Sequence, residues 1–215
     1  MQITVGASTY NLIAMPAAPG FSDLSITMED HVAVVESPYA PGNAQTQIWP
    51  GADRWSLQLA LPKMTAQQAG PWQAFLAALR GKANVFQIGD VSAGTPQGAA
   101  LGAPLVDGTI SGGNAVSAMV LNTKGWRASV YGQLMPNDYL QVGVRLYQAT
   151  AQVASDAGGK IQIPIWPSLR ETPADGAAIT LVNTVGVFRL SSNKRTWHTT
   201  NDRLTQISFS CTEVR

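Results

Sequence analysis

Residues 54–81, RWSLQLALPKMTAQQAGPWQAFLAALRG, join the clearest strand pattern of this chain to its clearest helix pattern. From Trp55 to Leu61, large apolar side chains alternate with small or polar ones, which is typical of a strand with one buried face. Pro62 ends this alternation, and beyond it apolar residues recur at helical spacing until Gly81 stops the run. The recurring residues are Ala69, Trp72, Phe75, Leu76 and Leu79. We therefore expect a strand followed by a helix whose apolar stripe packs on a sheet.

The start of the predicted helix has two interpretations. Thr65 followed by Gln68 resembles a capping box, in which each side chain accepts a hydrogen bond from the backbone of the other residue. A helix that begins at Thr65 would bend at Pro71. A helix that begins afresh near Pro71 would place the proline in its first turn, where the missing N–H costs nothing.

Strand patterns also dominate the two ends of the chain. Residues 24–35 are rich in strand formers, and from Ile207 to Cys211 apolar residues alternate with serines. No His or basic residue adjacent in sequence would lower the pKa of the Cys211 thiol, so we predict a core residue rather than a nucleophile. As the single cysteine of the chain it cannot form an internal disulfide, and nothing indicates an oxidising compartment.

The middle of the chain differs from its ends. Residues 92–114 are rich in glycine and poor in large apolar side chains, which favours loops and short strands. After this stretch, short apolar runs alternate with turn residues at a spacing typical of a small barrel.

Two similar strings bracket this middle region, Val85–Ile88 (VFQI) before it and Val187–Leu190 (VFRL) after it. We interpret them as neighbouring strands of one sheet. Residues 1–88 together with 187–215 would then form one domain, and residues 89–186 an inserted β-barrel-like domain.

The surface is expected to be neutral and polar. Charged residues make up 13% of the 215 residues and the net charge is +1, whereas about 25% charged residues is usual. Such a surface favours association and offers no field to attract phosphate, so nucleic acid is not an expected partner. No apolar run is long enough to span a bilayer and the N-terminus lacks the features of a signal peptide, so we expect synthesis in a cytosol without a membrane span.

No motif in the sequence predicts an active site or a bound cofactor. His31 and His198 lie in separate strand-like contexts, and without a second cysteine the chain lacks a usual zinc ligand set. The glycines before Lys160 fit a turn better than a phosphate loop, and no nucleophile elbow occurs. We therefore expect no catalytic residue, no metal site and no cofactor.

The predicted insertion holds carboxylates, and a glycosidase needs only two. They are Asp107, Asp138, Asp156, Glu171 and Asp175. Neighbouring prolines and glycines favour turn roles for them instead. Trp166, with Arg170 nearby, is a candidate for stacking on a glycan, although a buried structural role explains this tryptophan at least as well.

Several strings resemble those of a known family, the distal tail proteins found at the tail tip of long-tailed bacteriophages and prophages. The strings are IWPGADRWS at 48–56, LPKMT at 61–65, IWPSLR at 165–170 and VFRL at 187–190. The resemblance covers about residues 45–212, and its motifs are structural rather than catalytic.

This resemblance implies a mainly β fold with one helix, in which a β-sandwich forms a ring and a second, barrel-like β-domain faces outward. It implies a non-enzymatic virion protein, made in the host cytoplasm, whose ring is commonly a hexamer. The ring would join the tail tube protein to the tail hub and other tail-tip proteins, and a host surface glycan is a further candidate partner. We expect ring contacts from the loop 36–54, whose rigid apolar residues have no obvious strand partner. These residues are Pro38, Tyr39, Pro41 and Trp49.

Two other classes of protein stay open at this point. A carbohydrate-binding module or tail-associated glycan hydrolase would use the barrel as its working part, with paired carboxylates in an open cleft. Another ring-forming tail component, such as the tube or terminator protein, is disfavoured by the chain length and the inserted domain.

Overall fold

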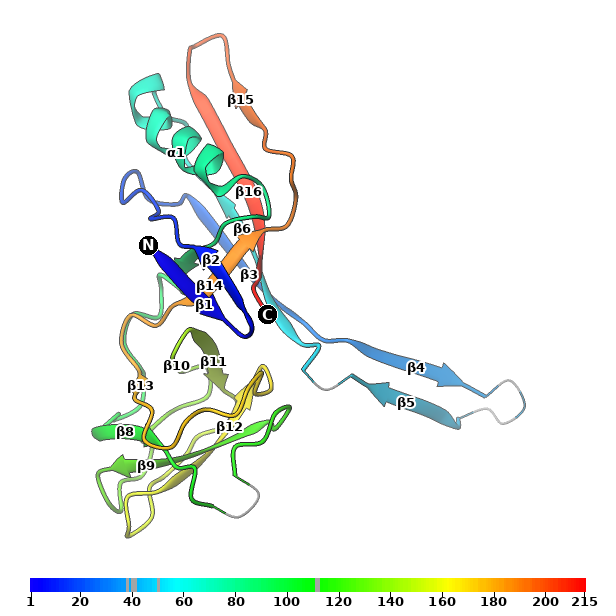
Figure 1. Cartoon of the computed structure of the whole chain (residues 1–215), viewed down its shortest axis with the longest axis vertical. Coiled ribbons are helices and arrows are strands. Elements are labelled where there is room, and N and C mark those ends of the chain that lie inside the picture. Colours follow the sequence, from blue (N-terminus) through cyan, green and yellow to red (C-terminus); the bar gives the residue numbers. More distant parts are fainter. Residues whose placement is uncertain (38, 40–41, 50, 111–112) are drawn as a thin grey trace.

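The chain folds into two antiparallel sheets, one above the other in Figure 1, with a two-stranded arm that projects where they meet. The computed structural model describes residues 1–37, 39, 42–49, 51–110 and 113–215. Strands dominate these residues and α1 (Ala66–Leu79) is their one α-helix, so the expected mainly β class with a single helix is confirmed. Within this described part, no helix has the length and apolar character needed to cross a membrane.

The main sheet has the strand order β3-β6-β16-β14-β7, and every neighbouring pair in it is antiparallel. β15 pairs with the N-terminal part of β16, at the end away from β14. The bounds are β3 (Asp23–Glu29), β6 (Arg54–Ala60), β7 (Phe86–Ile88), β14 (Gly186–Leu190), β15 (Trp197–Thr199) and β16 (Thr205–Glu213).

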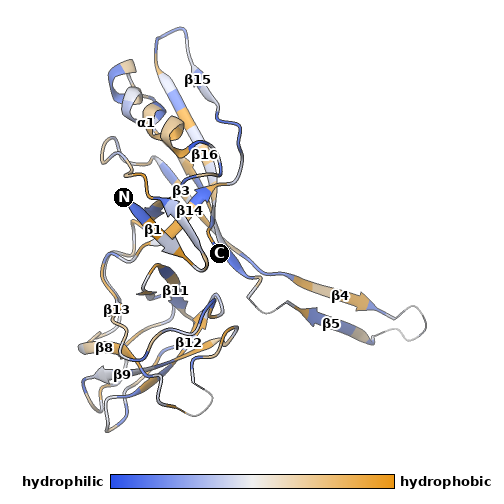
Figure 2. Ribbon diagram, in the orientation of Figure 1, coloured by the Kyte–Doolittle hydropathy of each residue, from blue (hydrophilic) through white to orange (hydrophobic). Residues whose placement is uncertain are grey.

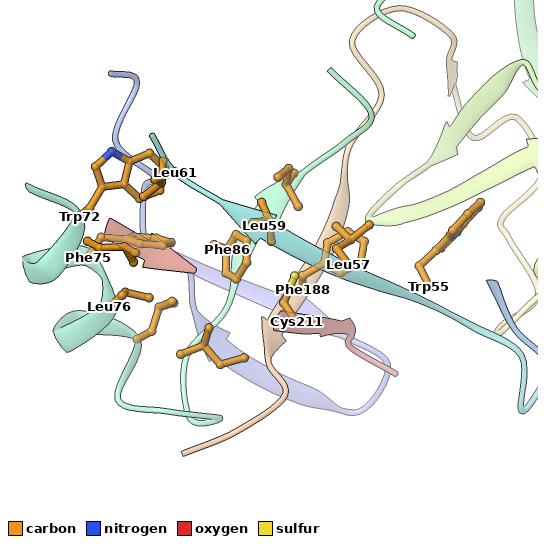
Figure 3. Packing of buried hydrophobic residues seen from close by; sticks show 14 of the residues in the cluster. Trp55, Leu57, Leu59, Leu61, Trp72, Phe75, Leu76, Phe86, Phe188 and Cys211 are labelled. Carbon is orange, nitrogen blue, oxygen red and sulfur yellow. The ribbon is translucent and has the colours of Figure 1, made fainter. Parts of the chain in front are cut away.

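Helix α1 covers one face of this sheet and builds the first core with it. Figure 3 shows the helix side chains against those of β6, β7 and β16. The ring of Phe75 meets Phe86 edge to face, with 5.5 Å between centroids, and Phe209 at 6.4 Å. The predicted burial of the helix stripe and of the cysteine is confirmed for Trp72, Phe75, Leu79 and Cys211.

The helix begins at Ala66, with Thr65 as its N-cap. The Thr65 N–H donates a hydrogen bond to Gln68 Oε1 at 3.1 Å, as the capping-box pattern predicts. Pro71 lies inside the helix, so the interpretation in which the helix starts afresh at this proline is wrong.

The hairpin of β1 (Gln2–Val5) and β2 (Ser8–Asn11) packs on the opposite face of the main sheet. Val187 precedes Phe188 in β14 and therefore points away from the helix. It packs in a small apolar cluster with Val5 and Val214. With the helix on one face and the hairpin on the other, the sheet is covered on both sides, as in a sandwich.

The second sheet, with the order β13-β10-β11-β12-β9-β8, curls into a nearly closed barrel. A bridge between Leu105 and Ala178 brings its first and last strands together. Its interior is a second apolar core, which includes Leu121, Ile163 and Leu169. The bounds are β8 (Gly102–Val106), β9 (Val120–Trp126), β10 (Tyr139–Val142), β11 (Arg145–Ala149), β12 (Ile161–Trp166) and β13 (Ile179–Thr180).

The barrel is inserted between two neighbouring strands of the main sheet. β7 and β14 are antiparallel partners, with Phe86 opposite Phe188, so the expected pairing of the two similar strings is confirmed. Gly89, just after β7, lies against Thr184, just before β14. A Cβ on Gly89 would lie 1.8 Å from the Thr184 carbonyl oxygen.

The core of the main sheet extends into the barrel. Tyr139, Leu146 and Trp166 of the barrel belong to the apolar cluster of the main sheet, where they surround Trp55. The pairing of β7 with β14 places the ends of the insertion near residues 88/89 and 186/187. That the two parts fold as separate domains divided at these positions stays a prediction.

Candidate functional site: the projecting arm

The arm is a β-hairpin of β4 (Val32–Glu36) and β5 (Ala44–Ile48), which continues the pairing of β3 with β6 outward. At its base, Arg54 Nε donates to Glu29 Oε2 at 2.6 Å, and the Trp49 N–H donates to the His31 carbonyl at 3.3 Å. The expectation of a loop over 36–54 is therefore wrong, because residues 44–48 form a strand that pairs with β4. Apolar β-branched residues in β4 and alternating polar residues in β5 explain why this segment pairs.

The two faces of the arm differ in chemistry. Directly opposite residues of an antiparallel pair lie on the same face, which places Val32 with Ile48 and Val34 with Thr46. We call this side, with Val32, Val34 and Ile48, the apolar arm face; Glu36 lies at its outer end. The other face carries Ala33 opposite Gln47 and Val35 opposite Gln45.

The apolar arm face is open to solvent. Val32, Val34 and Ile48 are 47%, 58% and 65% exposed, and in Figure 2 the apolar strand β4 runs far from either core. An isolated two-stranded hairpin is at best marginally stable in water, and contiguous exposed apolar surface usually marks an interaction site. The arm is thus the part of the chain that most needs a partner surface.

A hollow at the base of the arm extends this apolar surface onto the barrel. Val32, Ile48 and Trp49 line it from the arm side and Met119 from the barrel side. Asp53 borders it at its inner end.

Behind this hollow, a buried ionic network joins the barrel to the main sheet. Arg170 Nη1 lies 3.2 Å from Asp53 Oδ1, and Arg170 Nη2 lies 3.4 Å from Glu213 Oε2. Burial opposes ionisation of Asp53, but hydrogen bonds from Ser168 and the nearby Arg170 guanidinium outweigh it and lower its pKa. At the more deeply buried Glu213, burial outweighs the attraction of Arg170 and raises the pKa.

The candidate glycan contacts, Trp166 and Arg170, are not on the surface. Trp166 is 7% exposed, its ring packs edge to face on Trp55, and its Nε1 donates to Asp30 Oδ1 at 2.9 Å. The Arg170 side chain is 5% exposed and bound to the network above. A sugar can stack only on an accessible ring face, so this expectation is corrected: both residues hold the two sheets together.

The candidate ring residues have mixed outcomes. Tyr39 is 95% exposed near the arm tip, and Trp49 is 47% exposed at the arm base. Pro38 and Pro41 lie outside the described residues. Tyr39 and Trp49 are therefore accessible to a second molecule.

The carboxylates of the insertion are engaged in local structure. Asp138 accepts hydrogen bonds from the backbone N–H groups of Gln97, Gly98 and Met135. Asp107 forms an ion pair with Lys160, with 2.8 Å between Asp107 Oδ2 and Lys160 Nζ. Asp156, Glu171 and Asp175 likewise accept bonds from their own turn or from a neighbouring cation. Over the described residues, His, Cys, Asp and Glu side chains are nowhere grouped in threes as a metal ion would require.

A scan against protein-family models found no match to this chain. A search among curated proteins likewise found no similar sequence. Any proposal for function therefore rests on the motifs and on the geometry described above.

Proposed function

We propose that this chain is a structural, non-enzymatic subunit of a bacteriophage tail tip that assembles into a ring, six copies being the expected number. The ring would join the tail tube to the hub and the host-recognition apparatus. The single observation that carries this proposal is the arm, which holds apolar side chains away from both cores and into solvent.

The strings that resemble distal tail proteins support the proposal through what their residues do. Arg54 closes the arm base with Glu29, Trp55 anchors the barrel, and Thr65 caps the helix. These residues build a rigid platform from which the arm projects. Ring subunits need such a platform, because a contact must recur with the same geometry in every copy.

The low charge of the chain supports the same function. A subunit of a ring inside a tail is covered by two ring neighbours and by the structures above and below it. Neutral polar side chains serve such contacts with hydrogen bonds and a modest desolvation cost, and they leave little net charge to repel further copies.

The test is the copy number of this chain in intact tails. Quantitative mass spectrometry or an averaged image of the tail tip should give several copies, six being expected. A single copy per particle would contradict the proposal. The isolated protein is not a substitute for this measurement, because closure of the ring can require the tube as a template.

A further inference from the structure

The charges of the chain are segregated in space, although its net charge is close to zero. Residues 1–53, which include both strands of the arm, contain five carboxylates and no Lys or Arg. Six exposed cations gather instead along α1 and the β15–β16 hairpin, and we call this surface the basic end; the exposed Arg127, Lys160 and Arg215 lie elsewhere. The six are Lys63, Arg80, Lys82, Lys194, Arg195 and Arg203. The acidic residues beside them are Asp23 at the start of β3 and Asp202 at the hairpin tip.

Folding brings these cations together from three separate segments. The Lys82 N–H donates to Asn193 Oδ1 at 3.0 Å, next to Lys194 in sequence. Arg195 Nη1 donates to the Leu76 carbonyl at 3.0 Å, near the C-terminal end of the helix. No ion pair within the described residues neutralises any of the six cations.

A hollow opens in the middle of the basic end. Apolar side chains of Leu76, Leu190 and Phe209 form part of its lining, and Lys194 and Arg195 contribute cations. Trp197 of β15, 47% exposed, follows them in sequence. Serines and one threonine form most of the remaining lining, so the hollow is largely polar with a small apolar part and two cations. Such a surface fits a segment that presents a tyrosine, with its apolar ring and polar hydroxyl, together with a carboxylate.

The arm tip has this combination. Tyr39 is 95% exposed, and Glu36 is the one charged residue between Val32 and Trp49. The arm cannot reach the hollow of its own chain. It leaves the main sheet near the Thr212 end of β16, whereas β15 pairs with the Thr205 end, and the two hairpins diverge in Figure 1.

We propose that Glu36 and Tyr39 of one copy dock in the hollow beside β15 of a second copy, with Glu36 against Lys194 and the Tyr39 side chain in the hollow. This inference rests on the proposed function, since it defines the contact between neighbours in the ring. Because the two surfaces differ, the contact is heterologous, and such contacts propagate around a ring when the rotation between copies closes.

Cysteine cross-linking tests this contact, because the single native cysteine, Cys211, is fully buried. Tails would be assembled with the full-length double variant Tyr39→Cys and Lys194→Cys, their copy number measured first, and a short bismaleimide added. We expect a ladder of cross-linked copies. Either single variant alone should give none, and neither should a control that pairs Lys194→Cys with Tyr131→Cys on the exposed barrel surface.

The outcomes separate the two proposals. A multi-copy ring without the 39–194 cross-link would overturn the docking contact and leave the proposed function standing. Cross-linking of Tyr39→Cys alone would mean that arms meet one another, which also overturns it. A single copy per tail would refute the proposed function itself.

A charge exchange gives an independent measurement on the same assembled tails. When each variant is the only copy supplied for assembly, Glu36→Lys and Lys194→Glu should each lower the yield of multi-copy tails, by about 2- to 5-fold for an exposed ion pair. The double variant should recover most of the loss. If the fold loss of the double variant equals the product of the two single fold losses, Glu36 and Lys194 do not face each other.

Discussion

The indole rings of Trp55 and Trp166 meet edge to face, 4.5 Å between centroids at an angle of 86°, although 110 residues separate them in sequence. Trp55 also donates its Nε1–H to the Leu146 carbonyl at 3.0 Å. One residue of the main sheet thus makes an aromatic contact and a hydrogen bond with two strands of the barrel. These two interactions hold the main sheet and the barrel together.

Removal of the Trp166 side chain should therefore destabilise the whole protein. Trp166→Ala should lower the free energy of unfolding by about 3–5 kcal/mol, the usual cost of a large buried aromatic. Trp166→Phe keeps much of the packing but loses the bond to Asp30, which should cost less. Denaturant unfolding checks both, with Tyr131→Ala on the exposed surface as a control expected within about 0.5 kcal/mol of wild type.

The packing of the helix can be tested at Phe75, which touches Phe86 and Phe209. Phe75→Ala should cost about 3–5 kcal/mol in the free energy of unfolding and lower the melting temperature. Gln67→Ala, on the exposed side of the same helix, should leave it nearly unchanged. A Phe75→Ala protein with the wild-type melting temperature would contradict the helix packing.

Limited proteolysis tests the division into two folding units. The first cuts are expected within residues 92–114, which contain the long glycine-rich connections of the insertion. Fragments identified by mass spectrometry should leave residues 55–81 intact. Early cleavage inside 55–81 would overturn the proposed layout.

The stability of the barrel should depend on pH through Asp107. Hydrogen bonds from Lys160 and Thr109 hold the pKa of this buried carboxyl below its ordinary value of 3.8. A lowered folded-state pKa stabilises the protein above the unfolded pKa, and this contribution is lost as the pH falls through the folded value. Asp107→Asn should therefore destabilise more at pH 7 than at pH 3. An equal loss at both pH values would show that the charge of Asp107 contributes nothing.

A substitution on the apolar arm face should separate assembly from stability. Val34→Ser removes an exposed apolar group that no core uses, so the free energy of unfolding should change by less than about 0.5 kcal/mol. Incorporation into tails should fall, since the docked arm would bury this residue. Gln45→Ser, on the other face of the arm, is the matched control. If Val34→Ser is incorporated as well as wild type, the apolar arm face is not part of the ring contact.

Local features of this fold could be predicted because short-range periodicity determines them. The alternation from Trp55 to Leu61 and the apolar spacing of α1 each reflect one buried face, so the sequence alone indicates both elements. The similarity of Val85–Ile88 to Val187–Leu190 was enough to expect that they pair.

The junction and the arm could not be predicted in the same way. Asp53 and Arg170 are 117 residues apart, and no local pattern indicates that they share a buried ion pair. Val32 and Val34 have the pattern of a buried strand, yet they are exposed because no described segment of the chain covers this face of the arm. The signal that could have found this surface is the absence of Lys and Arg from residues 1–53.

The entry and exit of the barrel lie side by side, because Ile88 at the end of β7 faces Gly186 at the start of β14. Paired strands are about 4.8 Å apart, so the two ends of the insertion are held one strand spacing apart. The geometry of the main sheet is therefore independent of the length of the insertion. Evolution could exchange the barrel for any domain with adjoining termini and preserve both the helix and the arm. Such a replacement must meet two conditions: an apolar surface that covers Trp55, and a basic group that neutralises Asp53 and Glu213. The arm and the helix could then stay the same while the inserted domain varies.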